Sequence, residues 1–406
     1  MIAVLLGLAL VVPLAMLLAC LAQAGRARMP DWLALAPVPA LLAALVAPGA
    51  SLTLPPGLLR IWLALDVPGA ILLGVAALLW IAAAVYAAPW LRQRADAGGF
   101  VAWWLLTLAG SIGVFIAADL VGFYLVYSMV SLAAYGLVAD DGSVRARRAG
   151  AVYVAFAVLG EAFLLMAFVL LAQATPGGSL LIRDAVAALP AAPARDAILA
   201  LLLLGFGTKI GLVPLHVWMP LAYRAAPIPA AAVMSGAAVK AGIIGLIRFL
   251  PPDLALPAWG ATLAAFGLLS AFYGVAVGIT QPNPRTVLAY SSVSQMGLMG
   301  ALFGMGLSSG EGGVALAAAV YAAHHVLAKG TLFLSLGVVR GSGRLGWVSL
   351  LVAAILALSL AGLPLTGGAV AKLAVKGPLG FGIVGFLANV SAAGSDSIRE
   401  IGQRSA

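Results

Sequence analysis

The chain has 406 residues, of which 64% are hydrophobic and only 9% are charged, and its formal net charge is +9. Soluble globular proteins carry about 25% charged residues, so this composition excludes a soluble enzyme or binding module and indicates a polytopic membrane protein. The positive charge is concentrated in loop arginines, as the positive-inside rule requires, and does not indicate nucleic-acid binding.

Apolar segments long enough for a helix to cross a bilayer recur along the whole chain. They predict an all-α, polytopic membrane protein of about thirteen transmembrane helices, with no soluble domain between them. The expected spans are residues 2–24, 31–48, 68–88, 100–117, 119–138, 150–173, 196–221, 228–250, 256–279, 286–305, 313–339, 346–372 and 377–391.

The loops between these spans predict the orientation and the outer surface. If the N-terminus faces outward, eleven loop arginines lie on the cytoplasmic side and four on the other, which favours a bacterial inner-membrane protein with this topology. Two outer connections stand out. Residues 49–67 are expected to form a loop or short hairpin, and residues 174–195 a short interfacial helix.

Two of the spans contain helix breakers. Residues 205–221 and 361–372 each combine glycines, a proline and a lysine. Proline removes a helix hydrogen bond, and broken membrane helices commonly line cavities or ion sites. A simple kink is the alternative, but the lysines favour an ion pathway.

All five lysines lie in the second half of the chain: Lys209, Lys240, Lys329, Lys372 and Lys376. A lysine at mid-bilayer costs about 2.5–3.5 kcal/mol and marks a functional pathway. A desolvated lysine can release its proton, whereas arginine cannot. Four of the five are therefore predicted to carry protons, whereas Lys376, nearer the membrane end, is expected to extend to the interface.

The three histidines add possible relay groups. His325 precedes Lys329 by one helical turn, so the two share a face, and His324 is offset from them. His216 follows the first break, where a relay role and a hydrogen bond to a freed carbonyl are equally compatible with the pattern. No cysteine or acidic cluster accompanies the histidines, so we expect neither a metal site nor a cofactor.

Few acidic residues lie inside the predicted spans. Glu161 lies near the middle of span 150–173 and is the better functional candidate, whereas Asp119 begins its span and is expected to act as an end cap.

At this point the motifs resemble those of the antiporter-like membrane subunits of respiratory complex I, membrane-bound hydrogenases and Mrp-type cation/proton antiporters. The resemblance runs from about residue 60 to residue 376, and it rests on five motifs in the right order. They are Pro214–Pro220 with Ala226–Pro229, Gly236–Phe249, Arg285–Gly297, His324–Gly337 and Ala361–Lys372.

The resemblance implies two inverted five-helix repeats, each with one broken helix, and a central chain of lysines and histidines. Lys209 and Lys240 then resemble the lysines of the first broken helix and of the helix after it. Lys329 with His325 resembles the second-half pair, and Lys372 the ionisable group of the second broken helix. In one departure, Ser128 stands where the family usually has a glutamate, so either Glu161 replaces that carboxylate or the first half-channel is impaired.

The resulting domain division has three parts. Residues 1–98 hold the first helices, 99–391 form the proton-conducting domain, and the polar tail 392–406 is expected to be disordered. The leading functional hypothesis is a proton-translocating subunit of a redox-driven complex, with other membrane subunits as partners. The alternatives are a cation/proton antiporter subunit of Mrp type that acts without redox chemistry, with Na⁺ as the other candidate ion, a non-pumping scaffold, which Ser128 and the short C-terminus favour, and a subunit for inorganic carbon uptake.

Overall fold

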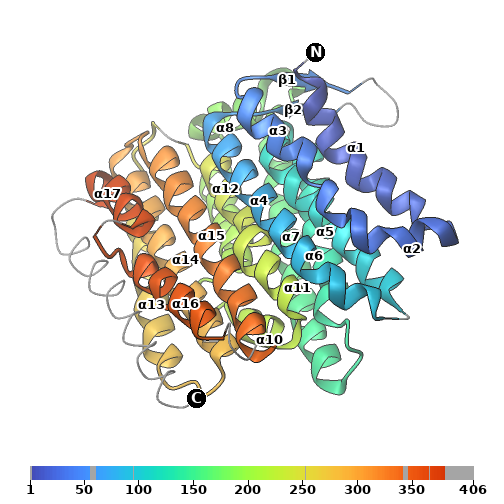
Figure 1. The fold of residues 1–406 in the computed structure, drawn as a ribbon. Coiled ribbons are helices and arrows are strands. Elements are labelled where there is room, and N and C mark those ends of the chain that lie inside the picture. The colour runs from blue at the N-terminus through green and yellow to red at the C-terminus, as the bar shows by residue number, and fades with distance from the viewer. Residues whose placement is uncertain are drawn as a thin grey trace.

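The computed structural model describes residues 2–54, 61–94, 96–251, 253–341, 346–364 and 366–379 (Figure 1). Most of these residues lie in helices that run up and down between two ends of the molecule. The helices are α1 (Val4–Ala19), α2 (Gln23–Trp32), α3 (Val38–Val46), α4 (Val67–Arg92), α5 (Ala97–Ile116), α6 (Leu120–Val138), α7 (Val144–Ala174), α8 (Ile182–Ala188), α9 (Arg195–Ile210), α10 (Trp218–Ala225), α11 (Ile228–Val233), α12 (Lys240–Phe249), α13 (Pro257–Gly278), α14 (Pro284–Ser309), α15 (Val314–Gly341), α16 (Gly346–Ala361) and α17 (Gly367–Leu379).

Among the described residues, eight helices are long and apolar enough to cross a membrane, with Gln23–Val46 and Ile228–Phe249 each counted as one. An integral, multi-pass, mostly helical protein is therefore confirmed. The count of thirteen helices and the inverted repeats are not confirmed. Most of the last predicted span, 377–391, and all of the tail 392–406 lie outside the described residues, and the three-part domain division stays a prediction.

Three helix boundaries differ from the expected ones. The first helix ends at Ala19, and the second crossing already begins at Gln23, because residues 23–32 are helical although they are too polar to be predicted as part of a span. Helix α7 starts at Val144, six residues before the predicted span, because Ser143 caps its first turn. Within the described residues helix α17 extends to Leu379 and includes Gly377 and Pro378, whereas the predicted spans end at residue 372 and begin again at residue 377.

Both connections have the predicted secondary structure and lie at the same end of the bundle, and their placement on the outer side stays a prediction. Strands β1 (Ser51–Thr53) and β2 (Trp62–Ala64) form an antiparallel hairpin, and α8 is the short helix of the second connection. The segment between α5 and α6 joins them, because Ala118 hydrogen-bonds to both Trp62 and Ile182 through backbone groups. The β1–β2 hairpin is the one exception to an all-α fold within the described chain.

Asp119 acts as the predicted end cap. Its carboxylate accepts hydrogen bonds from the backbone N–H groups of Gly122 at 2.7 Å and of Trp62 at 2.8 Å, and the residue is 1% exposed. The first satisfies an amide that has no partner within the helix, and the second attaches α6 to the hairpin. The buried carboxylate is therefore structural.

Glycines allow close contact between helices α13 and α14. Helices α13 and α14 pack with their backbones almost touching, and a Cβ atom on Gly267 would lie only 2.3 Å from the backbone nitrogen of Ala301. Small residues permit this approach in membranes, where association depends on van der Waals packing rather than on a hydrophobic driving force.

Helix α15 lies in the middle of the assembly. It packs against α4, α14, α16 and α17, and also against the helix formed by α11 and α12 (Figure 1). Its polar residues are therefore placed between the two broken segments of the chain.

Candidate functional site

The first break separates α9 from α10. Helix α9 ends at Ile210, Gly211 takes a left-handed conformation with φ 72°, and the Val213–Pro214 peptide bond is cis. The indole Nε1 of Trp218 donates to the carbonyl of Thr208 at 2.9 Å, and the same carbonyl accepts from the backbone N–H of Gly211, so two donors satisfy it at the end of the interrupted helix. The predicted break at 205–221 is therefore present, and it places Lys209 in the last turn of α9.

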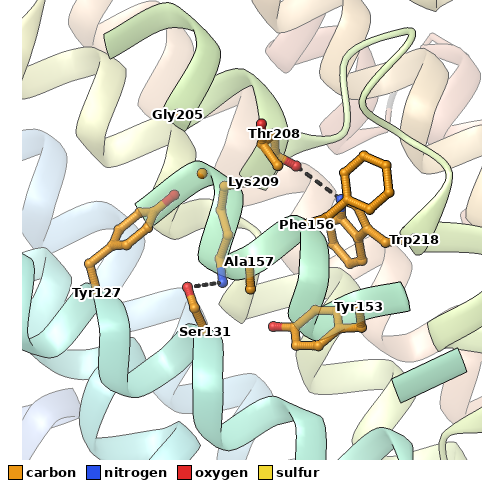
Figure 2. A pocket seen from close by; sticks show the side chains of 10 residues that line it. Tyr127, Ser131, Tyr153, Phe156, Ala157, Gly205, Thr208, Lys209 and Trp218 are labelled. Carbon is orange, nitrogen blue, oxygen red and sulfur yellow. Dashed lines mark hydrogen bonds between the residues drawn. The ribbon is translucent and has the colours of Figure 1, made fainter. Parts of the chain in front are cut away.

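Lys209 points into a pocket between α6, α7, α9 and α10. Figure 2 shows the side chains of Lys209 and Ser131 directed toward one another, with Tyr127 and Tyr153 on either side. The ammonium donates to Ser131 Oγ at 2.8 Å and lies 5.5 Å from the centre of the Tyr127 ring. Lys209 is 8% exposed, and the cavity beside it has a volume of only about 10 Å³.

Glu161 is the carboxylate that faces this lysine. It comes from α7, is 6% exposed, and interacts electrostatically with Lys209. The hydroxyls of Ser128 and Ser131 lie beside the carboxylate, although Glu161 Oε1 and Ser128 Oγ have no hydrogen-bond partner among the described residues. Ser128, where the family resemblance implies a glutamate, therefore lies next to Glu161. The acid near Lys209 comes from α7 rather than from α6.

Lys240 and His325 make the shortest direct contact between ionisable groups of the predicted pathway. The Lys240 ammonium lies 2.9 Å from His325 Nδ1, and both residues are 0% exposed. A π-helical turn, Met234–Ala238, immediately precedes Lys240. Such turns are rare and often occur at functional sites, but the sequence contains no proline there to predict one.

Lys329 lies one turn further along α15. Its ammonium donates to the backbone carbonyl of Leu288 at 3.0 Å, which also accepts from the hydroxyl of Ser292. His325 interacts electrostatically with Lys329, but its direct hydrogen bond goes to Lys240 instead. Lys329, the relay partner that the one-turn spacing predicts for His325, is therefore its electrostatic neighbour. The partner bonded to His325 is Lys240, which comes from another helix.

His324 faces away from this pair toward the second break, where α16 ends at Ala361 and α17 begins at Gly367. Its Nε2 lies 2.9 Å from Ser359 Oγ on α16. The side chain of Lys372, which is half-buried, folds back over Gly362. The predicted break at 361–372 is present, whereas the side chain of Lys376 lies outside the described residues.

His216 lies apart from the lysines, in the segment between α9 and α10. Its ring packs edge-on against Tyr273, with centroids 4.8 Å apart, and the ring of Tyr290 lies 6.2 Å away. The carbonyl of Pro214 is beside the ring, and Nδ1 has no partner among the described residues. This environment is compatible with both roles considered for His216.

Several polar groups of the site were missed by sequence reasoning. Ser131 bonds Lys209, and Ser359 bonds His324. Tyr321, one turn before His325 on α15, donates its hydroxyl hydrogen to Gln295 at 2.5 Å. The run of serines and a glutamine in residues 291–295 was a visible signal, because such residues are rare in an apolar span. Single serines carry no such signal, since many of them only bond their own helix.

Comparisons with known proteins agree with this architecture. Residues 117–377 match the family model described as NADH:quinone oxidoreductase/Mrp antiporter, TM. NADH-quinone oxidoreductase subunit N of Desulforudis audaxviator is 34% identical over 66% of this chain and 54% of that protein. Hydrogenase-4 component B of Escherichia coli is 29% identical over 68% of this chain and 43% of that protein.

A solved structure of the Mrp complex from Dietzia has the same fold, with a TM-score of 0.81 and 24% identity over 100% of this chain and 46% of that one. The chain spans about half the length of the curated relatives it matches. Because the family model covers well over half of the chain, the protein belongs to the antiporter-like membrane subunits of the NADH:quinone oxidoreductase/Mrp antiporter family.

Proposed function

We propose that this chain is a proton-translocating membrane subunit of a redox-driven complex in a bacterial inner membrane. Protons would move along the buried groups Lys209, Lys240, His325, Lys329 and Lys372, with Glu161 controlling the first of them. The redox chemistry would belong to partner subunits, because the motifs of this chain supply only groups that carry protons.

The observation that carries the proposal is the contact between Lys240 and His325. Two fully buried basic groups lie 2.9 Å apart. Because two like charges in a low dielectric repel strongly, protonation of one group disfavours protonation of the other. Such a pair has a high cost as a purely structural element. It is suited to passing a proton from one helix to another.

Neighbouring contacts extend this pair in both directions. Lys209 packs against Gly242, two residues after Lys240, so close that a Cβ on that glycine would lie 3.2 Å from the lysine Cβ. Lys329 continues the row along α15. The row therefore supports a path that crosses the bundle between the two breaks.

Glu161 is proposed to replace the carboxylate that is missing at Ser128. A carboxylate near Lys209 favours its charged form, and withdrawal of that charge favours proton release. The carboxylate interacts with the lysine from α7 and lies beside Ser128, so an acid still acts on Lys209 although a different helix supplies it.

The family also includes Mrp-type antiporters, and a cation/proton antiporter subunit is the second candidate. Na⁺ prefers several oxygen ligands, as hard cations do. Around Lys209 the described residues supply one carboxylate and the hydroxyls of serine, threonine and tyrosine side chains, whereas the rest of the row is ammonium and imidazole. This chemistry favours protons, and transport that requires Na⁺ would favour the alternative.

Proton uptake into energised membrane vesicles, made from cells that express the full chain with its partner subunits, tests the proposal. Lys209→Ala is expected to abolish proton transport, because the first buried ammonium of the row is lost. Lys376→Ala is the matched control and should leave transport unchanged. Normal proton transport by Lys209→Ala would refute the mechanism.

A further inference from the structure

Two adjacent histidines on α15 serve different parts of the molecule. His325 contacts Lys240 on α12, whereas His324 contacts Ser359 on α16, at 2.9 Å. Residues next to each other in a helix point about 100° apart, so one short segment can reach both the lysine row and the second break.

Ser359 connects His324 to the start of α17. Its Oγ also accepts a hydrogen bond from the backbone N–H of Gly368, at 3.3 Å. That amide lies in the first turn of α17, where backbone N–H groups have no partner within the helix. The two helices touch here, because a Cβ on Gly368 would lie 1.5 Å from the carbonyl oxygen of Ser359.

We propose that His324 is a positioning residue that couples its own protonation to the geometry of the second broken helix through Ser359. In the neutral state the Ser359 hydroxyl donates to His324 Nε2 while its oxygen accepts from Gly368. When His324 takes up a proton, Nε2–H donates to the oxygen instead, and the serine hydrogen must turn to another acceptor.

The acceptor within reach of a helical serine is the carbonyl one turn back, here that of Ile355. A serine that bonds this carbonyl bends its helix slightly. Protonation of His324 therefore changes the end of α16 beside the break, and with it the setting of Lys372, whose side chain lies against Gly362. This role in transport rests on the proposed function, but the coupling can be measured without transport.

Other ionisable groups near His324 come from the same row. His325 interacts electrostatically with His324 and with Lys329 and Lys240, and Lys372 is on α17. The described part of α16 has no titratable side chain. On α4, Tyr86 approaches Gly337, more than three turns further along α15. Among the described residues at the second break, Ser359 bonds both His324 and the first turn of α17.

Hydrogen exchange of the Gly368 amide, in the full chain in lipid nanodiscs and corrected for the intrinsic pH dependence of exchange, tests the coupling. In the wild type, protection of Gly368 should fall by about two- to tenfold from pH 8 to pH 6, because the Nε2–H of protonated His324 competes with the Gly368 N–H for the Ser359 oxygen. His324→Gln keeps an N–H donor but cannot titrate, so its protection should stay constant.

Two further variants define the contact. Ser359→Ala should lower the protection of Gly368 by about two- to tenfold at every pH. Ser335→Ala, which removes a serine bonded to the Thr331 carbonyl of its own helix, is the matched control and should leave it unchanged. If the wild type shows no pH dependence, or if His324→Gln retains it, the inference is wrong.

Transport separates this inference from the proposed function. His324→Gln should still move protons but with a flatter pH profile, whereas Lys209→Ala should move none. Normal transport by Lys209→Ala together with a titrating Gly368 would refute proton conduction and leave the coupling intact. Loss of transport in Lys209→Ala, together with Gly368 protection that does not depend on pH, would support proton conduction and refute the coupling.

Discussion

Replacing Glu161 by glutamine removes the charge that faces the buried ammonium of Lys209 while keeping the size of the side chain. The ammonium then retains only the hydroxyl of Ser131 at 2.8 Å and the face of Tyr127 at 5.5 Å. Glu161 acts on Lys209 electrostatically rather than through a direct salt bridge, and a nearby opposite charge favours the charged form of a group by about 1.4–4 kcal/mol. At the lower end this corresponds to a factor of about 10 against the charged lysine.

Because loading of Lys209 is the first step of the proposed path, we expect Glu161→Gln to slow proton uptake by about tenfold or more. The assay is the initial rate of proton uptake in energised vesicles, at equal amounts of protein. Glu311→Gln is the matched control and should transport normally. It changes an exposed acid in the loop between α14 and α15.

The position of Ser128 allows the carboxylate to be moved to the neighbouring helix. Its hydroxyl lies beside the Glu161 carboxylate, so a glutamate at position 128 should reach the same lysine from α6. We expect Ser128→Glu combined with Glu161→Gln to recover most of the lost rate. Full transport by Glu161→Gln alone, or a double variant no faster than the single one, would refute this assignment of the carboxylate.

Two predictions concern stability, measured as the free energy of unfolding in detergent. Gly267→Ala should destabilise the protein by about 1–3 kcal/mol, because its Cβ would lie 2.3 Å from the backbone nitrogen of Ala301. Gly99→Ala is the control and should cost little, because a Cβ at Gly99 would have nothing within 4 Å. Equal losses of stability in the two variants would contradict the packing argument. Asp119→Ala should cost about 2–3 kcal/mol through the lost cap and the unpaired amide of Trp62, and Asp119→Asn should retain most of the stability.

Sequence reasoning was sufficient where the bilayer imposes simple rules. A hydrocarbon layer accepts only long apolar helices, so most spans and the multi-pass architecture could be predicted from composition alone. Breaks were visible because glycine and proline act locally on the backbone. The buried lysines were recognisable because a charge in an apolar segment is costly wherever the helix packs.

Pairing between helices could not be predicted, because it depends on the rotation of each helix about its axis. The spacing of His325 and Lys329 pointed to a contact within α15, yet the bonded partner of His325 is Lys240 on α12. The π-helical turn before Lys240 left no signal either, since its backbone is held by surrounding helices rather than by local residue preference.

The amino-acid sequence by itself determined which groups lie within the membrane and where two helices break, because hydrophobicity, proline and glycine act over a few residues. Only the tertiary structure decided which of those groups meet. It brought Glu161 of α7 to the lysine beside Ser128, and it turned His324 and His325 toward different helices. The physical reason is that hydrogen bonds act over about 3 Å, a distance that helix packing alone sets for residues far apart in the chain.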